Sequence, residues 1–135
     1  MLQKNNIQVE FESKKPIYVW ADEFYIEQVV TNYFTNAIKH TEEIGNNKKI
    51  KITVKQLNDK MRITVFNTGK TIPEEDLTRI WGRFYKVDSS RNRQDGGTGI
   101  GLALVKAIMN NYLNEYGVNN KKDGVEFYFD VDIPR

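Results

Sequence analysis

Four glycines stand together ahead of an apolar stretch, in the run Gly96-Gly97-Thr98-Gly99-Ile100-Gly101-Leu102. Because glycine has no Cβ, its backbone turns freely and lets another molecule approach its amide groups closely. The apolar stretch predicts a helix over 99–114, whose N-terminus would add unpaired N–H donors and a partial positive charge. Together these features predict a cradle for phosphate groups.

Two common nucleotide-binding loops do not match this run. A dinucleotide-binding fold places G-x-G-x-x-G directly after a strand, whereas the residues before Gly96 are largely polar and no third glycine follows Gly99 and Gly101 in step. The phosphate-binding loop G-x-x-x-x-G-K-[ST] is absent. A purely structural use of the glycines stays open from these residues alone.

A polar stripe runs along a second expected helix, over 22–41. Asn32, Asn36 and His40 are four residues apart and so share one helix face, with Lys39 beside them. A carboxamide oxygen can ligate Mg²⁺ while phosphate oxygens and waters complete the octahedron, and a lysine can neutralise a phosphate. A solvated helix face explains the same residues equally well.

Two further segments combine residue types that suit a ligand. In Asn67-Thr68-Gly69-Lys70-Thr71-Ile72 a strand runs into a glycine turn, where a polar side chain could hydrogen-bond a ligand. Segment 80–88 mixes aromatic and cationic side chains and precedes Arg91, so it could cover a nucleotide, a protein partner or single-stranded nucleic acid. The net charge of +2 argues against nucleic acid. Ordinary connections also explain each segment taken alone.

Composition narrows the function further. A chain of 135 residues with 39% hydrophobic content is typical of one soluble globular domain. The absence of cysteine excludes disulfides and thiolate metal sites, and a single histidine disfavours a histidine metal centre. No apolar run approaches the roughly 20 residues that span a bilayer, and the polar start lacks a signal-peptide pattern. We expect a cytoplasmic domain, whole or part of a larger protein.

The elements that must position these groups follow from periodicity. Alternating apolar residues predict strands at 7–11, 17–19, 50–54, 61–65 and 125–133. A short helix is expected over 73–80, because proline suits a first helical turn. One-faced strands predict a mostly antiparallel sheet with the helices on a single side, an α/β two-layer sandwich.

Taken in order, four segments resemble the ATP-binding catalytic domain of bacterial two-component sensor histidine kinases, in the GHKL ATPase superfamily. Residues 28–41 are similar to its N box, 67–72 to its first glycine box, 81–88 to its F box and 97–102 to its second glycine box. The resemblance covers nearly the whole chain and implies the Bergerat ATP-binding fold. It also implies one domain over 1–135 with an ATP lid at about 81–98.

The resemblance implies a role for each box. Asn36 would ligate a Mg²⁺ bridging the phosphates of ATP, with Asn32 close by. Lys39, Lys86 and Arg91 would contact phosphates, and Asn36, Lys86 and Arg91 are the expected catalytic residues. The other implied contacts to the nucleotide are His40 in the place of an aromatic that packs on the base, Asn67 and Gly69 in the first glycine box, Ile72 and Leu102 in the adenine pocket, and Gly97, Thr98, Gly99 and Gly101 at the phosphates.

The resemblance is incomplete at three positions. The family's first glycine box usually opens with an aspartate that accepts a hydrogen bond from the adenine amino group, whereas this chain has Asn67. Thr71 replaces the second glycine of that box, and Val125 replaces a small hydroxyl residue. Because charge-assisted hydrogen bonds are roughly twice as strong as neutral ones, Asn67 is expected to cost about 1 kcal/mol, or about fivefold in affinity. We expect weaker and less strict adenine recognition.

The resemblance implies a histidine protein kinase domain, a transferase of two-component signal transduction. It would donate the γ-phosphoryl group of ATP to a histidine on the parent's own dimerisation domain, with a response regulator downstream. Because the only histidine is His40, in the nucleotide stripe, the chain is not expected to phosphorylate itself. The chain would be a C-terminal cytoplasmic fragment without membrane contact, from a parent anchored in the bacterial cell membrane.

Two alternatives stay open. One is a stand-alone serine kinase of the anti-sigma-factor type, from the same superfamily. The other is a degenerate, non-enzymatic interaction module, in which Asn67 and Thr71 mark lost nucleotide binding.

Overall fold

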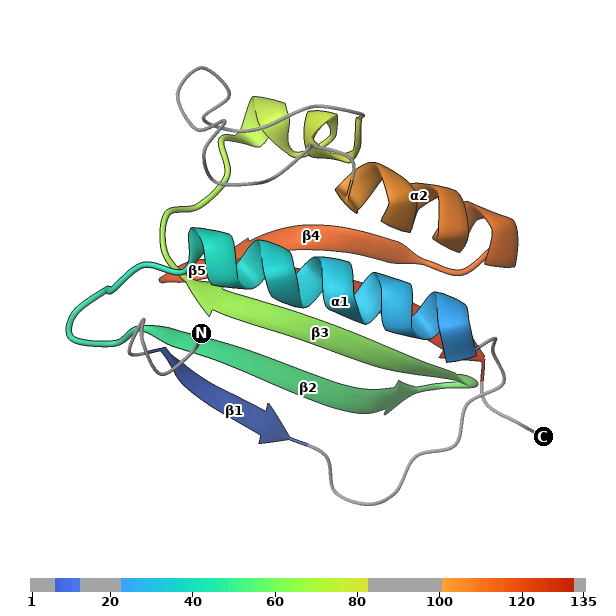
Figure 1. Cartoon of the computed structure of the whole chain (residues 1–135), viewed down its shortest axis with the longest axis horizontal. Coiled ribbons are helices and arrows are strands. Elements are labelled where there is room, and N and C mark those ends of the chain that lie inside the picture. Colours follow the sequence, from blue (N-terminus) through green and yellow to red (C-terminus); the bar gives the residue numbers. More distant parts are fainter. Residues whose placement is uncertain (1–6, 13–22, 83–100, 133–135) are drawn as a thin grey trace.

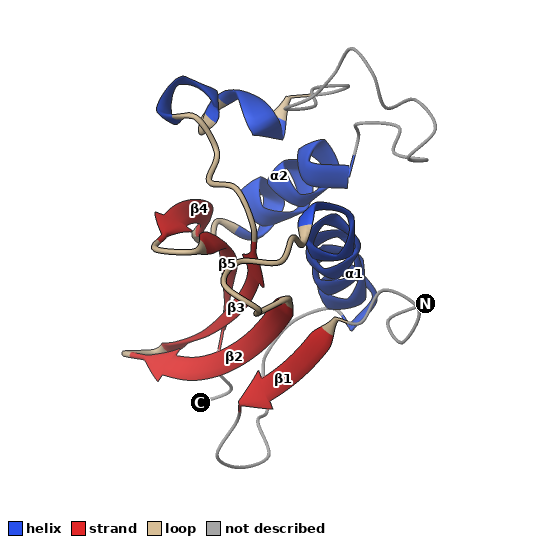
Figure 2. Cartoon of the chain, turned by 90° about the vertical axis from the view of Figure 1, so that its left-hand side faces the viewer, coloured by secondary structure: helices blue, strands red, loops and turns tan. Residues whose placement is uncertain are grey.

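The computed structural model describes residues 7–12, 23–82 and 101–132. Within them, five strands form one sheet in the order β1-β2-β3-β5-β4, and the helices α1 and α2 cover one of its faces (Figures 1 and 2). The strands are β1 Gln8–Glu12, β2 Lys49–Leu57, β3 Lys60–Thr68, β4 Tyr116–Lys121 and β5 Gly124–Asp132; the helices are α1 Glu23–His40 and α2 Gly101–Tyr112, with 3-10 turns η1 Glu74–Asp76 and η2 Arg79–Trp81. The predicted α/β two-layer sandwich is confirmed.

The sheet is mixed but mostly antiparallel, as predicted. β2, β3 and β5 pair antiparallel in the centre, with Ile52 opposite Val65 and Val65 opposite Phe127, and β4 pairs antiparallel with β5. β1 pairs in parallel with β2, which follows it in the chain only after α1. The strand expected at 17–19 lies outside the described residues.

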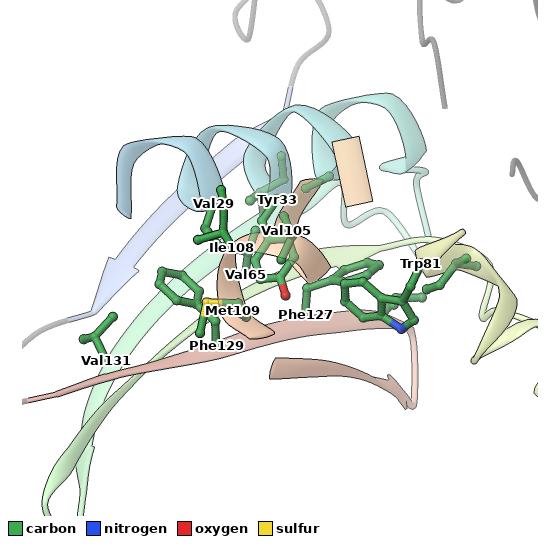
Figure 3. Close-up of a cluster of buried hydrophobic side chains, with 14 of the residues drawn as sticks. Val29, Tyr33, Val65, Trp81, Val105, Ile108, Met109, Phe127, Phe129 and Val131 are labelled. Carbon is green, nitrogen blue, oxygen red and sulfur yellow. The ribbon is translucent and has the colours of Figure 1, made fainter. Parts of the chain in front are cut away.

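The core lies between the sheet and the two helices (Figure 3). On α1, Val29, Tyr33 and Ala37 recur every four residues and are buried, which is the stripe that the periodicity predicted. The alternating apolar residues of the central strands pack against this stripe from the sheet. The buried residues of α2 and the last strand are Val105, Ile108, Met109, Val125, Phe127, Phe129 and Val131.

Tyr33 is the centre of an aromatic group. Its ring lies 5.2 Å from Phe127 and 5.8 Å from Phe129, between ring centroids, and its hydroxyl donates a 3.0 Å hydrogen bond to the Tyr128 carbonyl. That bond gives the buried hydroxyl the partner it needs. Burial is also the main reason why the pKa of Tyr33 is raised far above its usual value.

Trp81, at the end of η2, packs into the same group. Its ring contacts Tyr33, Phe127 and Tyr116, the last with centroids 5.0 Å apart. The side chain is therefore part of the core at the point where the segment resembling the F box begins. Trp81 thereby fixes the segment that follows β3 against the sheet.

Three sequence predictions need correction. Residues 73–80 do not form one helix: η1 and η2 are separate 3-10 turns, because so short a segment gains little from helical hydrogen bonds. α2 ends at Tyr112 rather than at 114, because the next residue, Leu113, adopts a left-handed conformation with φ 58°. The strand β4 was not predicted, because its glycine and asparagines are poor strand formers.

None of the helices in the described ranges combines the length and the apolar content that spanning a bilayer requires.

Candidate functional site

The polar stripe of α1 meets the start of α2. A Cβ added to Gly101, the first residue of α2, would lie 2.9 Å from Asn32 Oδ1. Asn32 Nδ2 donates a 2.8 Å hydrogen bond to the Gln28 carbonyl one turn earlier, which holds the amide with its oxygen toward Gly101. A side chain at residue 101 would therefore push the Asn32 amide out of this position. Two segments 69 positions apart in the sequence are thereby brought together.

Asn36 lies one turn beyond Asn32 on the same face and is half-buried. Within the described residues its carboxamide has no hydrogen-bond partner, in contrast to that of Asn32. Lys39 and His40 follow at the C-terminus of α1, where both are exposed. The cationic Lys39 is favourable there, because the helix end carries a partial negative charge.

The turn after β3 packs against this end of α1. Gly69 has φ 145°, and a Cβ there would lie 2.8 Å from the His40 carbonyl oxygen. Its own N–H donates a 2.9 Å hydrogen bond to the Asp123 carbonyl. The first glycine box is thus seated between α1 and the β4–β5 hairpin, and Gly69 is the residue that permits both contacts.

Asn67 is buried where β3 ends. Its Nδ2 donates a 3.0 Å hydrogen bond to the Thr68 carbonyl, and its cross-strand partner is the buried Val125. The next residue along, Gly124, approaches Asn67 so closely that a Cβ there would lie 1.9 Å from the Asn67 carbonyl oxygen. Oδ1 is the acceptor atom of this amide, and no hydrogen bond within the described residues engages it, so it could accept one from a ligand.

Thr68 joins three segments and was not singled out from the sequence. Its hydroxyl donates to the Glu42 carbonyl at 2.8 Å and accepts from the Lys49 N–H at 2.9 Å. The Glu42 N–H in turn donates to the Thr68 carbonyl at 2.9 Å. The loop after α1 is therefore fixed to the start of β2 and the end of β3. A hydroxyl residue just before a strand-ending glycine is the only sequence signal for this role.

The two residues predicted for the apolar wall, Ile72 and Leu102, are half-buried and pack against the core. The backbone of Ile72 makes two hydrogen bonds to the side chain of Asn120: Ile72 N–H to Oδ1 at 2.9 Å, and Nδ2 to the Ile72 carbonyl at 2.8 Å. The sequence did not identify Asn120 as a functional residue either, because its strand β4 was not predicted. Thr71, beside Ile72, is exposed.

The structure therefore brings the candidate residues of α1, of the first glycine box and of α2 to one end of the molecule. Five of the predicted residues lie outside the described part of the chain: Lys86, Arg91, Gly97, Thr98 and Gly99. Their roles stay predictions.

Comparison with known proteins gives consistent matches. The family model described as "Histidine kinase-, DNA gyrase B-, and HSP90-like ATPase" matches residues 21–135. The sensor protein CiaH of Streptococcus pneumoniae is 34% identical over 131 residues, which are 96% of this chain and 29% of CiaH. The chain thus spans less than a third of that relative.

Solved structures agree with this match. The catalytic domain of the histidine kinase ThkA is 34% identical, with a TM-score of 0.82 over 98% of this chain and 82% of that one. A structure of ThkA in complex with the response regulator protein TrrA matches with 30% identity and a TM-score of 0.76, over 98% of this chain and 36% of ThkA.

Proposed function

Because this chain belongs to the histidine kinase-, DNA gyrase B- and HSP90-like ATPases, and within them to the catalytic domains of sensor histidine kinases, we propose that it binds Mg²⁺-ATP and donates the γ-phosphoryl group to a histidine on a separate dimerisation domain. The observation that carries the proposal is the contact of Gly101 with Asn32. It brings the first residue of α2 against the asparagine stripe of α1, which supports a shared site for the phosphate-binding and metal-binding features proposed for these segments.

The donor set at α1 fits a magnesium ion. Mg²⁺ prefers oxygen ligands in an octahedron and is commonly held by one or two protein groups plus phosphates and waters. The half-buried Asn36 carboxamide, uncommitted within the described residues, would supply the protein oxygen. When bound, the metal would neutralise charge that develops on the phosphates.

The remaining residues of this end of the molecule would position and shield the nucleotide. Asn32 is oriented by its bond to Gln28 and would keep the start of α2 in register with Asn36. Lys39 would add positive charge near the phosphates. The proposal assigns the other phosphate contacts to residues outside the described part of the chain: Lys86, Arg91, Gly97, Thr98 and Gly99.

At the base, the proposal assigns adenine recognition to Asn67, with Ile72 and Leu102 as apolar walls. Asn67 Oδ1 would accept a hydrogen bond from the adenine amino group, with the amide oriented by the bond from its Nδ2 to the Thr68 carbonyl. A neutral amide accepts more weakly than a carboxylate. The side chain of the buried Val125 beside it has no polar atom that could hold a water. We therefore propose weaker and less strict recognition of adenine than an aspartate would give.

The phosphoacceptor histidine would lie on the parent's own dimerisation domain. The single histidine of this chain, His40, lies at the end of α1 against the turn of Gly69 and would contact the nucleotide instead. A response regulator would receive the phosphoryl group, a partner that the ThkA–TrrA complex supports. The chain would act as one cytoplasmic ATP-binding domain of a membrane-anchored parent. Radiolabel retained on His40 after incubation with γ-labelled ATP would contradict this assignment.

A calorimetric titration with ATP, with and without Mg²⁺, tests the proposal. We expect micromolar to submillimolar binding that strengthens with Mg²⁺. The variant Asn36→Ala should lose the strengthening by Mg²⁺, whereas Asn111→Ala, an exposed asparagine on α2, should retain it. No binding at millimolar ATP would favour an interaction module without nucleotide function.

A further inference from the structure

Asn120 holds the backbone of a residue 48 positions away in the sequence. Its Oδ1 accepts a 2.9 Å hydrogen bond from the Ile72 N–H, and its Nδ2 donates a 2.8 Å bond to the Ile72 carbonyl. The side chain of Asn120 thus bonds both backbone groups of Ile72, in the way that the backbone of a neighbouring strand would. A carboxamide is suited to this, because it carries one acceptor and one donor side by side.

Few other groups fix this part of the box. For residues 70–72, the other backbone hydrogen bond within the described residues is a longer one, from the Lys70 N–H to Glu42 Oε1 at 3.3 Å. Pro73 has no N–H to donate. The Gly69 N–H is bound by the Asp123 carbonyl in the β4–β5 hairpin. The hairpin therefore holds the segment at both ends, through Asp123 at its start and Asn120 at Ile72.

The hairpin is itself a firm support. β4 pairs with β5 along its whole length, and Tyr116 at its start packs edge-on against the buried Trp81. Asn120 lies opposite the buried Val125 in this pairing, so it shares the helix-covered face of the sheet. Its neighbour Asn119 lies opposite Glu126 and so projects to the other face.

We propose that Asn120 is a positioning residue for nucleotide binding, which sets the place of Ile72 as a wall of the adenine pocket. The inference rests on the proposed function. Losing both hydrogen bonds would free the segment between Gly69 and Pro73, so that Ile72 would have to be ordered again each time a nucleotide binds. We expect about tenfold weaker ATP binding in Asn120→Ala, as for the loss of one or two neutral hydrogen bonds.

The test compares three variants by calorimetric titration with ATP, with and without Mg²⁺. Asn120→Ala should bind ATP about tenfold more weakly than the unmodified chain, and Asn120→Asp, which keeps the acceptor for the Ile72 N–H but loses the donor, should fall between them. Asn119→Ala is the matched control and should bind as the unmodified chain does. The factor by which Mg²⁺ strengthens binding should stay unchanged in all three, because the metal would sit at the phosphates.

Equal ATP affinity in Asn120→Ala and the unmodified chain would overturn the inference and leave the proposed function standing. An equal loss in Asn119→Ala would also overturn it, since the effect would then belong to β4 as a whole. Should Asn120→Ala fail to fold, Asn120→Asp carries the same comparison. If the unmodified chain binds no ATP, the proposed function falls and this role of Asn120 falls with it.

Discussion

Gly101 and Asn32 are in direct contact, with space for a hydrogen but not for a methyl group: a Cβ at residue 101 would lie 2.9 Å from Asn32 Oδ1. The contact fixes how α2 approaches α1. Since Asn32 Oδ1 is the end of a side chain rather than backbone, it can move aside. A larger residue at position 101 should therefore change the position of the Asn32 side chain more than the stability of the fold.

The substitution Gly101→Ala tests this. The new methyl group should displace Asn32 from its bond to the Gln28 carbonyl, and we expect about fivefold weaker ATP binding. The free energy of unfolding should change by less than about 1 kcal/mol, because alanine is the better helix former. Titration with ATP and urea unfolding measure the two quantities separately.

A double-mutant cycle identifies the cause. In the background Asn32→Ala, the step Gly101→Ala should have little further effect on ATP affinity, because the displaced group is gone. An undiminished effect in that background would show that the methyl group acts elsewhere.

The contact between Gly124 and Asn67 is of another kind. A Cβ at 124 would lie 1.9 Å from the Asn67 carbonyl oxygen, which is backbone in the centre of the sheet and cannot move alone. We expect Gly124→Ala to lower the free energy of unfolding by at least about 2 kcal/mol. Gly45→Ala is a control for backbone strain without a clash: no atom of the described residues other than its chain neighbours lies within 4 Å of a Cβ there, and the φ of 54° should cost about 1 kcal/mol. Comparable losses in urea unfolding for both variants would contradict this explanation.

The centre of the fold could be predicted from the sequence. β5 alternates Val125, Phe127 and Phe129 with polar residues, and burial of the first set is what that pattern predicts. β4 could not be predicted in the same way. Gly117 and Asn120 have little tendency to form a strand, and the pairing with β5 imposes that conformation on them.

The candidate site was predictable only in part. Spacing alone puts Asn32 and Asn36 on one helix face. It does not predict that Asn32 turns its oxygen toward Gly101 while Asn36 stays uncommitted among the described residues, because the contact with Gly101 depends on where α2 begins in space. Asn120 illustrates the same limit, since its partner Ile72 is 48 positions away.

Tyr33 should give the fold a distinctive response to alkaline pH. Burial, with smaller contributions from Tyr128 and Tyr116, raises its pKa above the usual 10.0. Above about pH 10 the phenol ionises in the unfolded chain but stays neutral in the folded one, so the unfolded state binds fewer protons and stability falls as pH rises, by up to about 1.4 kcal/mol per pH unit. Below about pH 10 this contribution is fully present.

The variant Tyr33→Phe separates the two effects of the hydroxyl. At about pH 8 it should be less stable by about 1 kcal/mol, because it lacks the hydrogen bond to the Tyr128 carbonyl. At about pH 11 the deficit should shrink or reverse, since phenylalanine does not ionise. Urea unfolding of both chains at the two pH values measures this. A deficit that is the same at both would show that Tyr33 ionises alike in the two states.

Restoring a carboxylate at the first glycine box tests how this chain recognises adenine. Asn67→Asp should bind ATP about fivefold more tightly, because a charged acceptor makes the stronger hydrogen bond. The same change removes the donor to the Thr68 carbonyl and buries a charge, so stability should fall by about 1 kcal/mol or more. In competition binding, the unmodified chain should prefer ATP over GTP by less than about a hundredfold, and Asn67→Asp should increase the preference. A preference above a hundredfold in the unmodified chain would mean that the amide, held by Thr68 with its oxygen free, discriminates as an aspartate does.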